Sequence, residues 1–155
     1  MEIEKKYLTE NIPFSLDGFD KKEMSQCYIS LSPTIRLRKE DNTYVLTVKS
    51  KGTVAREEFE LEITEEEYNR LKLKSETPEV IKTRYYIPLE NGLTAETDIY
   101  YGNLKGLITT EVEFKTIEDA ENFTAPEWFG KDVTMDNRYK NTSLSIYGIP
   151  EKTDL

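Results

Sequence analysis

The chain has 155 residues, of which 33% are charged and 37% hydrophobic, and its formal net charge is -9 at pH 7. This length suffices for one domain with its own core, and the negative charge opposes general binding to nucleic acid or to an anionic membrane. Histidine is absent and Cys27 is the single cysteine, so histidine bases, imidazole zinc sites and an internal disulfide are excluded.

The first half of the chain consists mainly of segments in which charged and apolar side chains alternate. Alternation has the two-residue period of a strand. Strands are predicted over residues 2–8, 24–31, 35–38, 44–49 and 56–63. Thr64 and Glu67 match a capping box, so we expect a helix that ends near Lys74.

The second half continues the pattern and then changes. Strands are predicted over residues 81–87, 93–100 and 107–115, with Asn91-Gly92 as a hairpin turn. Helices are predicted over residues 117–122 and 137–147, the second capped by Asp136 and ended by Gly148.

The elements predict one domain, 1–155, with a β-rich α+β fold. We expect residues 1–116 to hold the strands and one inserted helix, and residues 117–155 to form a helical plug or lid. No apolar run could span a bilayer and no basic-then-apolar leader is present, so we expect a cytoplasmic protein.

Each predicted strand carries its charged side chains on one face. In chain order these rows are Glu2, Glu4 and Lys6; Arg36 and Arg38; Lys49; Arg56, Glu58, Glu60 and Glu62; Lys82 and Arg84; Glu96 and Asp98; Glu111 and Glu113. A sheet with one solvent-exposed face would have such charged rows on that face even if they had no functional role. However, cationic and anionic pairs lie on separate strands, which is unfavourable unless ligands neutralise them. A closed barrel with a charged lumen would use both kinds of row.

Such a lumen suits phosphate chemistry. Arginine and lysine bind phosphate oxygens, while carboxylates hold Mg²⁺ or Mn²⁺. Metal and cations together stabilise a transferring phosphoryl group without a histidine or a nucleophilic side chain. The competing Gly-rich phosphate loop, Gly-x-x-x-x-Gly-Lys-Ser/Thr, is absent from the sequence.

The ordered motifs resemble those of the CYTH superfamily, the triphosphate tunnel metalloenzymes. The matching segments are Glu2-Ile3-Glu4-Lys5-Lys6, Arg36-x-Arg38, Lys49, Arg56-Glu57-Glu58-Phe59-Glu60, Lys82-x-Arg84, Glu96-x-Asp98, Glu111-x-Glu113 and the tail Asp132-Val133-Thr134 with Asp136, Arg138-Tyr139 and Asn141. The resemblance covers essentially the whole chain. It implies an eight-stranded antiparallel β-barrel that forms a tunnel, with a few peripheral helices.

The resemblance also implies roles for individual residues. The implied metal ligands are Glu2, Glu4 and Glu113, with Glu58, Asp98 and Glu111 as further or water-mediated ones. The implied phosphate ligands are Lys6, Arg36, Arg38, Lys49, Lys82 and Arg84, with Arg56 and Arg138 as additional candidates. The implied catalytic set is Glu2, Glu4, Lys6, Glu58, Glu111 and Glu113. Glu62 and Glu96 could instead be structural partners of the cations.

The activity that we predict first is hydrolysis of inorganic tripolyphosphate to pyrophosphate and phosphate by metal-activated water. The superfamily also includes thiamine and RNA triphosphatases and class IV adenylyl cyclases. Those cyclases carry a His-Phe before the opening motif, whereas this chain has only Met1 there. This difference counts against cyclase activity. Class IV-type adenylyl cyclase, thiamine or nucleoside triphosphatase, and a non-catalytic polyphosphate or nucleotide sensor remain alternatives. We expect a small anionic triphosphate as substrate, no nucleic-acid or membrane partner, and a monomer or homodimer.

Overall fold

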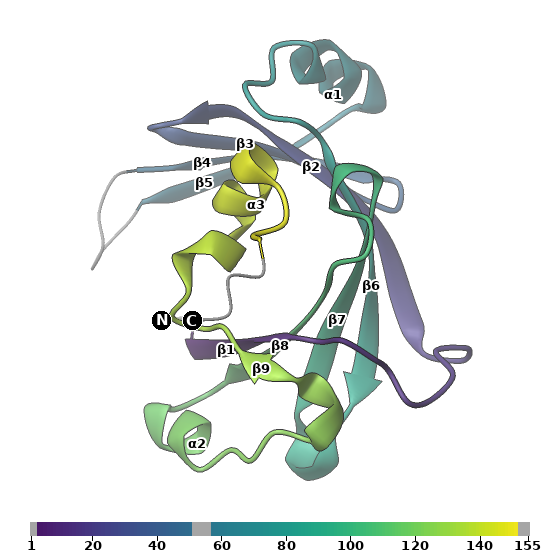
Figure 1. The fold of residues 1–155 in the computed structure, drawn as a ribbon. Helices are drawn as coiled ribbons and strands as arrows, with labels where there is room; N and C mark the ends of the chain where they lie inside the picture. Colours follow the sequence, from purple (N-terminus) through teal and green to yellow (C-terminus); the bar gives the residue numbers. More distant parts are fainter. Residues whose placement is uncertain (1–2, 51–56, 152–155) are drawn as a thin grey trace.

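One strongly curved antiparallel sheet dominates the computed structural model, which describes residues 3–50 and 57–151. Its strands lie in the order β5-β4-β3-β2-β6-β7-β8-β1-β9. They are β1 (Ile3–Leu8), β2 (Asp20–Leu31), β3 (Thr34–Glu40), β4 (Thr43–Lys49), β5 (Glu58–Ile63), β6 (Val80–Pro88), β7 (Thr94–Tyr101), β8 (Ile108–Phe114) and β9 (Lys131–Asp132). The curvature gives the sheet a concave inner face and a convex outer face (Figure 1).

The helices are short and lie on both faces of the sheet. The α-helices are α1 (Glu65–Lys72), α2 (Ile117–Glu121) and α3 (Asn141–Tyr147), and the 3-10 turns are η1 (Glu90–Gly92), η2 (Gly102–Leu104), η3 (Glu127–Phe129) and η4 (Asn137–Tyr139). None of the helices in the described part of the chain is long and apolar enough to cross a bilayer. The β-rich α+β class predicted from the sequence is confirmed.

The sheet does not close, so the predicted eight-stranded closed barrel is wrong for the described residues. The sheet has nine strands, and its edge strands β5 and β9 do not pair with each other. The free edge of β1 is taken by the C-terminal segment: Val133 N donates to Lys6 O at 2.8 Å, and Lys6 N donates to Thr134 Oγ1 at 3.0 Å. Because these backbone groups are already bonded, β5 cannot pair with this edge.

Two predicted boundaries differ from the observed ones for identifiable reasons. Strand β2 begins at Asp20 rather than Met24, because its charged start pairs with β6, as in Lys22 opposite Arg84. The helix predicted over residues 137–147 is interrupted at Lys140, whose backbone is extended (φ -68°, ψ 148°). The preceding carbonyl, that of Tyr139, accepts a hydrogen bond from the Lys6 ammonium instead of continuing a helix.

The outer face of the sheet is largely apolar, and helix α1 and turn η3 cover parts of it, whereas Phe59, Leu61 and Ile81 on this face stay exposed. Helix α1 places Tyr68 on a cluster that includes Leu37 and Cys27, and Cys27 is the buried core residue that its strand position predicts. At the other end of the sheet, η3 places Phe129 against Tyr7 and other side chains of β1, β7 and β8. Burial of the apolar rows on this face leaves the charged rows for the concave face.

The capping box of α1 has both of its hydrogen bonds. Glu67 N donates to Thr64 Oγ1 at 3.1 Å, and Thr64 N donates to Glu67 Oε1 at 2.9 Å. We expect Thr64→Ala to lower the free energy of unfolding by about 0.5–2 kcal/mol in urea denaturation. Activity should not change, because α1 packs on the outer face. Thr124→Ala, at an exposed loop position, is the control; equal midpoints for the two variants would contradict the prediction.

Candidate active site

The strand registers bring the charged rows onto the concave face. Residues directly opposite one another in an antiparallel pair point to the same side of the sheet. On β1, β8, β7 and β6 the opposed pairs are Glu4 with Glu113, Lys6 with Glu111, Glu96 with Glu111, and Arg84 with Asp98. On β3, β4 and β5 they are Arg36 with Thr47, Thr47 with Glu60, and Lys49 with Glu58. The shared face predicted for these rows is therefore observed.

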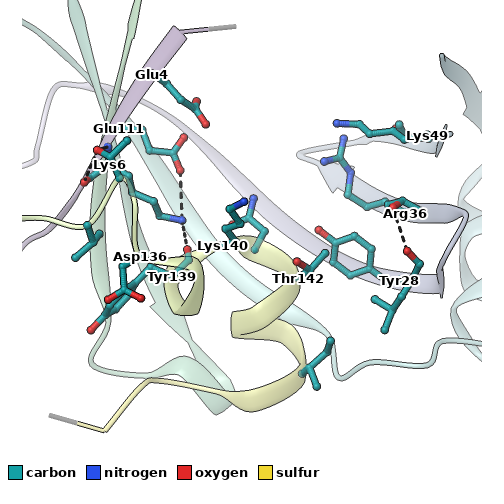
Figure 2. A pocket seen from close by; sticks show the side chains of 17 residues that line it. Glu4, Lys6, Tyr28, Arg36, Lys49, Glu111, Asp136, Tyr139, Lys140 and Thr142 are labelled. Carbon is teal, nitrogen blue, oxygen red and sulfur yellow. Dashed lines mark hydrogen bonds and ion pairs between the residues drawn. The ribbon is translucent and has the colours of Figure 1, made fainter. Parts of the chain in front are cut away.

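A cavity of about 650 Å³ opens on this face (Figure 2). The predicted site residues that line it are Glu4, Lys6, Arg36, Lys49 and Glu111. They come from both ends of the sheet, β1 and β8 on one side and β3 and β4 on the other. The remaining wall is the C-terminal segment from Val133 to Ile146, which packs on the sheet through the buried side chains of Val133, Tyr139 and Leu144.

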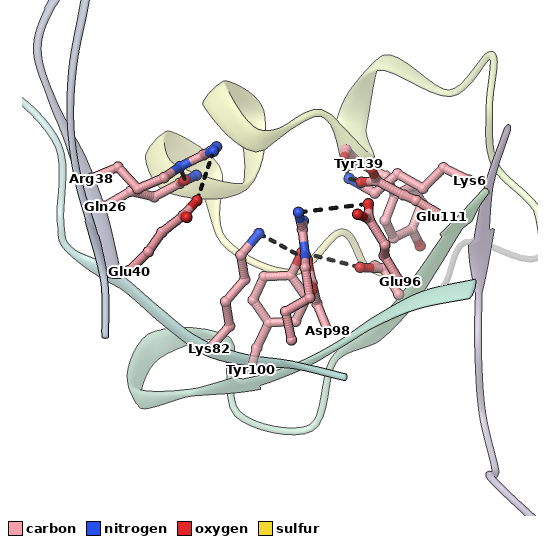
Figure 3. A network of polar contacts seen from close by, with 12 residues as sticks. Lys6, Gln26, Arg38, Glu40, Lys82, Glu96, Asp98, Tyr100, Glu111 and Tyr139 are labelled. Atoms are coloured by element: carbon pink, nitrogen blue, oxygen red, sulfur yellow. Dashed lines mark hydrogen bonds and ion pairs between the residues drawn. The ribbon is translucent and has the colours of Figure 1, made fainter. Parts of the chain in front are cut away.

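Behind the cavity, Asp98 joins two cations in a buried cluster (Figure 3). Its Oδ1 lies 2.7 Å from Arg84 Nε, its Oδ2 lies 2.9 Å from Arg84 Nη2, and Lys82 Nζ is 2.8 Å from Oδ2. The side chains of Lys82 and Asp98 are each 1% exposed. Arg84 Nη1 is also 3.7 Å from Glu96 Oε2, so Glu96 partners a cation as the sequence analysis suggested.

The charge states within this cluster follow from its contacts. Burial would raise the pKa of the Asp98 carboxyl, but the charge of Lys82 and the hydrogen bonds from Arg84 outweigh it and lower the pKa to about 2. Burial of Arg84 is likewise outweighed by Asp98, which raises the pKa of the guanidinium. Complete burial lowers the pKa of Lys82. Asp98 is therefore an anion that fixes both cations in place.

Two other predicted cations also have internal partners. Lys6 Nζ lies 3.6 Å from Glu111 Oε1 and donates to Tyr139 O. Arg38 Nε donates to Gln26 Oε1 at 3.2 Å, and its Nη1 is 3.5 Å from Glu40 Oε1. Burial, together with neighbouring cations, lowers the pKa of Arg38. These side chains are held in position before any ligand binds.

The wall formed by β3 and β4 contains buried polar groups whose hydrogen bonds are unsatisfied. Arg36 Nε and Thr47 Oγ1 are buried without a hydrogen-bond partner, and these two residues lie opposite each other and line the cavity. In the described part of the chain, neither Arg36 nor Lys49 forms an ion pair with a carboxylate. Buried donors without acceptors are unfavourable, and an anion in the cavity would satisfy them.

The carboxylates at the β1–β8 side suit a hard divalent cation. Glu4, Glu111 and Glu113 share the concave face, and carboxylate oxygens are the ligands that Mg²⁺ and Mn²⁺ prefer. Within residues 3–50 and 57–151 no group of three acidic or cysteine side chains already has metal-binding geometry. The donor types therefore fit a metal that keeps several waters or takes further oxygens from its substrate.

The remaining predicted residues lie elsewhere. Glu58 is exposed on the edge strand β5, opposite Lys49. Arg138 is bound to Asp136, with Nη2 and Oδ2 2.7 Å apart, and does not line this cavity. Glu2 and Arg56 fall outside the described residues.

Sequence reasoning missed several residues that line the cavity. Thr47 shares the strand face of Lys49 two positions later, so the two-residue period contained this information. Tyr28, opposite Arg36, could have been found in the same way from β2. Lys140 carries no such signal, because it lies at an interruption of the predicted helix.

Comparisons with known proteins extend over nearly the whole chain. The chain is 37% identical over 150 residues to an inorganic triphosphatase of Nitrosomonas europaea, which covers 94% of this chain and 97% of that protein. An inorganic triphosphatase of Acetivibrio thermocellus is 33% identical over 146 residues, covering 92% of each chain. A crystal structure of an inorganic triphosphatase matches with a TM-score of 0.80, 34% identity and 97% coverage of both chains. No protein-family model matches the chain.

Proposed function

The chain belongs to the family of the inorganic triphosphatases, and from that membership we propose that it hydrolyses inorganic tripolyphosphate to pyrophosphate and phosphate. The structural observation that carries this proposal is the cavity in which cations on one wall face carboxylates on the other (Figure 2). Arg36 and Lys49, without carboxylate partners, provide positive charge for phosphate oxygens. Glu4 and Glu111 provide negative charge for a metal.

The geometry supports distinct roles for the walls. Glu4, Glu111 and Glu113 would hold Mg²⁺ or Mn²⁺, and the motif resemblance adds Glu2 to this set. When bound, such a metal activates water and neutralises charge on the transferring phosphoryl group. Lys6, fixed between Glu111 and the carbonyl of Tyr139, places its ammonium next to these carboxylates. Its position suits a contact with the phosphate nearest the metal.

The opposite wall would bind the rest of the triphosphate. The Arg36 Nε donor and the Thr47 hydroxyl, both without partners, would be satisfied by phosphate oxygens. Deeper in the site, Lys82 and Arg84 are already oriented by Asp98, so little side-chain entropy is lost when they bind a ligand. Asp98 then acts on this site through the two cations, since both of its oxygens face them.

A tunnel does not require a closed barrel in this chain. We propose that the open sheet and the C-terminal segment enclose the substrate together, because residues 131–134 occupy the edge of β1 and residues 133–146 line the cavity. The C-terminal segment would thus enclose the cavity on the side where, in a closed barrel, the two edge strands would pair.

A product assay tests the proposed function. With Mg²⁺ or Mn²⁺, the protein should convert tripolyphosphate and water into equal amounts of pyrophosphate and phosphate, and a chelator should abolish this activity. ATP, thiamine triphosphate and pyrophosphate should react more slowly. Formation of cyclic AMP from ATP would instead identify a cyclase. Thermal stabilisation by tripolyphosphate without any product, with either metal, would identify a sensor.

A further inference from the structure

The C-terminal segment contributes a cation to the cavity at a rigid point of its backbone. Lys140 lies between η4 and α3, where the backbone is extended. Its neighbour Tyr139 is 7% exposed, and Leu144 in the following helix is 2% exposed. Both side chains belong to the same buried cluster on the sheet. The backbone at Lys140 is therefore anchored on both sides, while its side chain is exposed and lines the cavity.

The Lys140 side chain lies in the cavity between its two charged walls. In Figure 2 it stands with Lys6 and Glu111 on one side, and with Tyr28 and Arg36 on the other. No carboxylate in the described part of the chain forms an ion pair with it. The protein thus places another positive charge in the cavity without neutralising it.

Two of the carboxylates that line the cavity, Glu111 and Asp136, are bound to other cations. Glu111 is paired with Lys6, and Asp136 holds Arg138 through both of its oxygens. The contrast between Arg138 and Lys140 is informative, since the two residues are only two positions apart. Arg138 does not line the cavity and is neutralised by Asp136, whereas Lys140 lines the cavity and has no ion pair in the described part of the chain.

We propose that Lys140 is a substrate-binding residue whose ammonium contacts phosphate oxygens of the bound triphosphate and links the cations of the two walls. This inference rests on the proposed function and assigns the open side of the sheet a part in substrate recognition. A lysine suits this position, because its ammonium is a compact charge on a flexible chain that can follow a mobile phosphate group. It also couples the C-terminal segment to the ligand.

A contact made in both the ground state and the transition state changes KM more than kcat. We therefore expect Lys140→Gln to raise KM for tripolyphosphate about tenfold or more, which is the usual loss for one charge-assisted hydrogen bond. The change in kcat should be small. Lys140→Arg should recover most of the affinity, because it restores the charge. The ligand-free melting temperature should not move in either variant, since the side chain has no internal partner.

The experiment compares these variants with Lys105→Gln, which removes an exposed charge that does not line the cavity. KM, kcat and the thermal shift produced by tripolyphosphate without metal are measured for each protein. Loss of the shift in Lys140→Gln, with wild-type behaviour in Lys105→Gln, supports the inference. An active wild type with equal KM in both glutamine variants overturns it and leaves the proposed function intact. If tripolyphosphate raises the melting temperature of the wild type but is not hydrolysed, the proposed activity is refuted. The thermal shift that tripolyphosphate produces in Lys140→Gln would still decide whether Lys140 binds the ligand.

Discussion

Glu4→Gln should lower the turnover of tripolyphosphate by roughly 10²- to 10³-fold, the loss typical when one strong electrostatic contact to a reacting phosphoryl group is removed. Glu4 lines the cavity and lies opposite Glu113 on the neighbouring strand. Glutamine keeps the shape of the side chain but removes the charge that a divalent cation requires. The defect should therefore appear as a loss of kcat together with weaker activation in a titration with Mg²⁺ or Mn²⁺.

The stability of the same variant separates a metal ligand from a structural residue. Without metal, its melting temperature should equal or exceed that of the wild type, because removal of one of two facing carboxylates relieves repulsion. Glu121→Gln, at an exposed position at the end of α2, is the matched control and should behave as the wild type in both assays. Wild-type turnover by Glu4→Gln at saturating metal would refute the assignment of Glu4.

The shared face of the charged rows was predictable because strand periodicity is local. Alternation alone places Glu4 with Lys6 and Glu111 with Glu113 on one face of their strands, and the observed registers then join these faces. Alternation does not say which strands are neighbours. The motif order, through its family resemblance, supplied the expectation that cations and carboxylates meet in one site.

The open edge and its consequences were not predictable from these patterns. Whether β1 pairs with β5 or with residues 131–134 depends on contacts across more than a hundred residues, such as Val133 with Lys6. The break at Lys140 likewise depends on a distant residue, since the ammonium of Lys6 binds the carbonyl of Tyr139. Local sequence favours a continuous helix there, and tertiary contacts override this preference.

Asp98→Asn should destabilise the protein by about 3–5 kcal/mol, because it leaves the buried ammonium of Lys82 without a carboxylate partner. The only ion pair that Arg84 then keeps among the described residues is the longer one with Glu96. For a domain of this size such a loss lowers the melting temperature by roughly 10 °C or more. Asp17→Asn, at an exposed loop position, is the control and should have little effect. Equal melting temperatures for the two variants would show that the buried cluster contributes no net stability.

The free energy of unfolding should also depend on pH through the Asp98 carboxylate. Because the pKa of Asp98 is lowered to about 2 from its ordinary 3.8, its stabilising contribution is complete above about pH 4 and disappears as the pH falls toward 2. The difference in unfolding free energy between wild type and Asp98→Asn should therefore shrink over this range.

Tripolyphosphate at neutral pH should also reduce the difference in unfolding free energy between wild type and Asp98→Asn, because its oxygens can replace the carboxylate as acceptors for Lys82 and Arg84. If the ligand stabilises wild type and variant equally, the two cations do not contact phosphate, and Asp98 serves only the stability of the sheet.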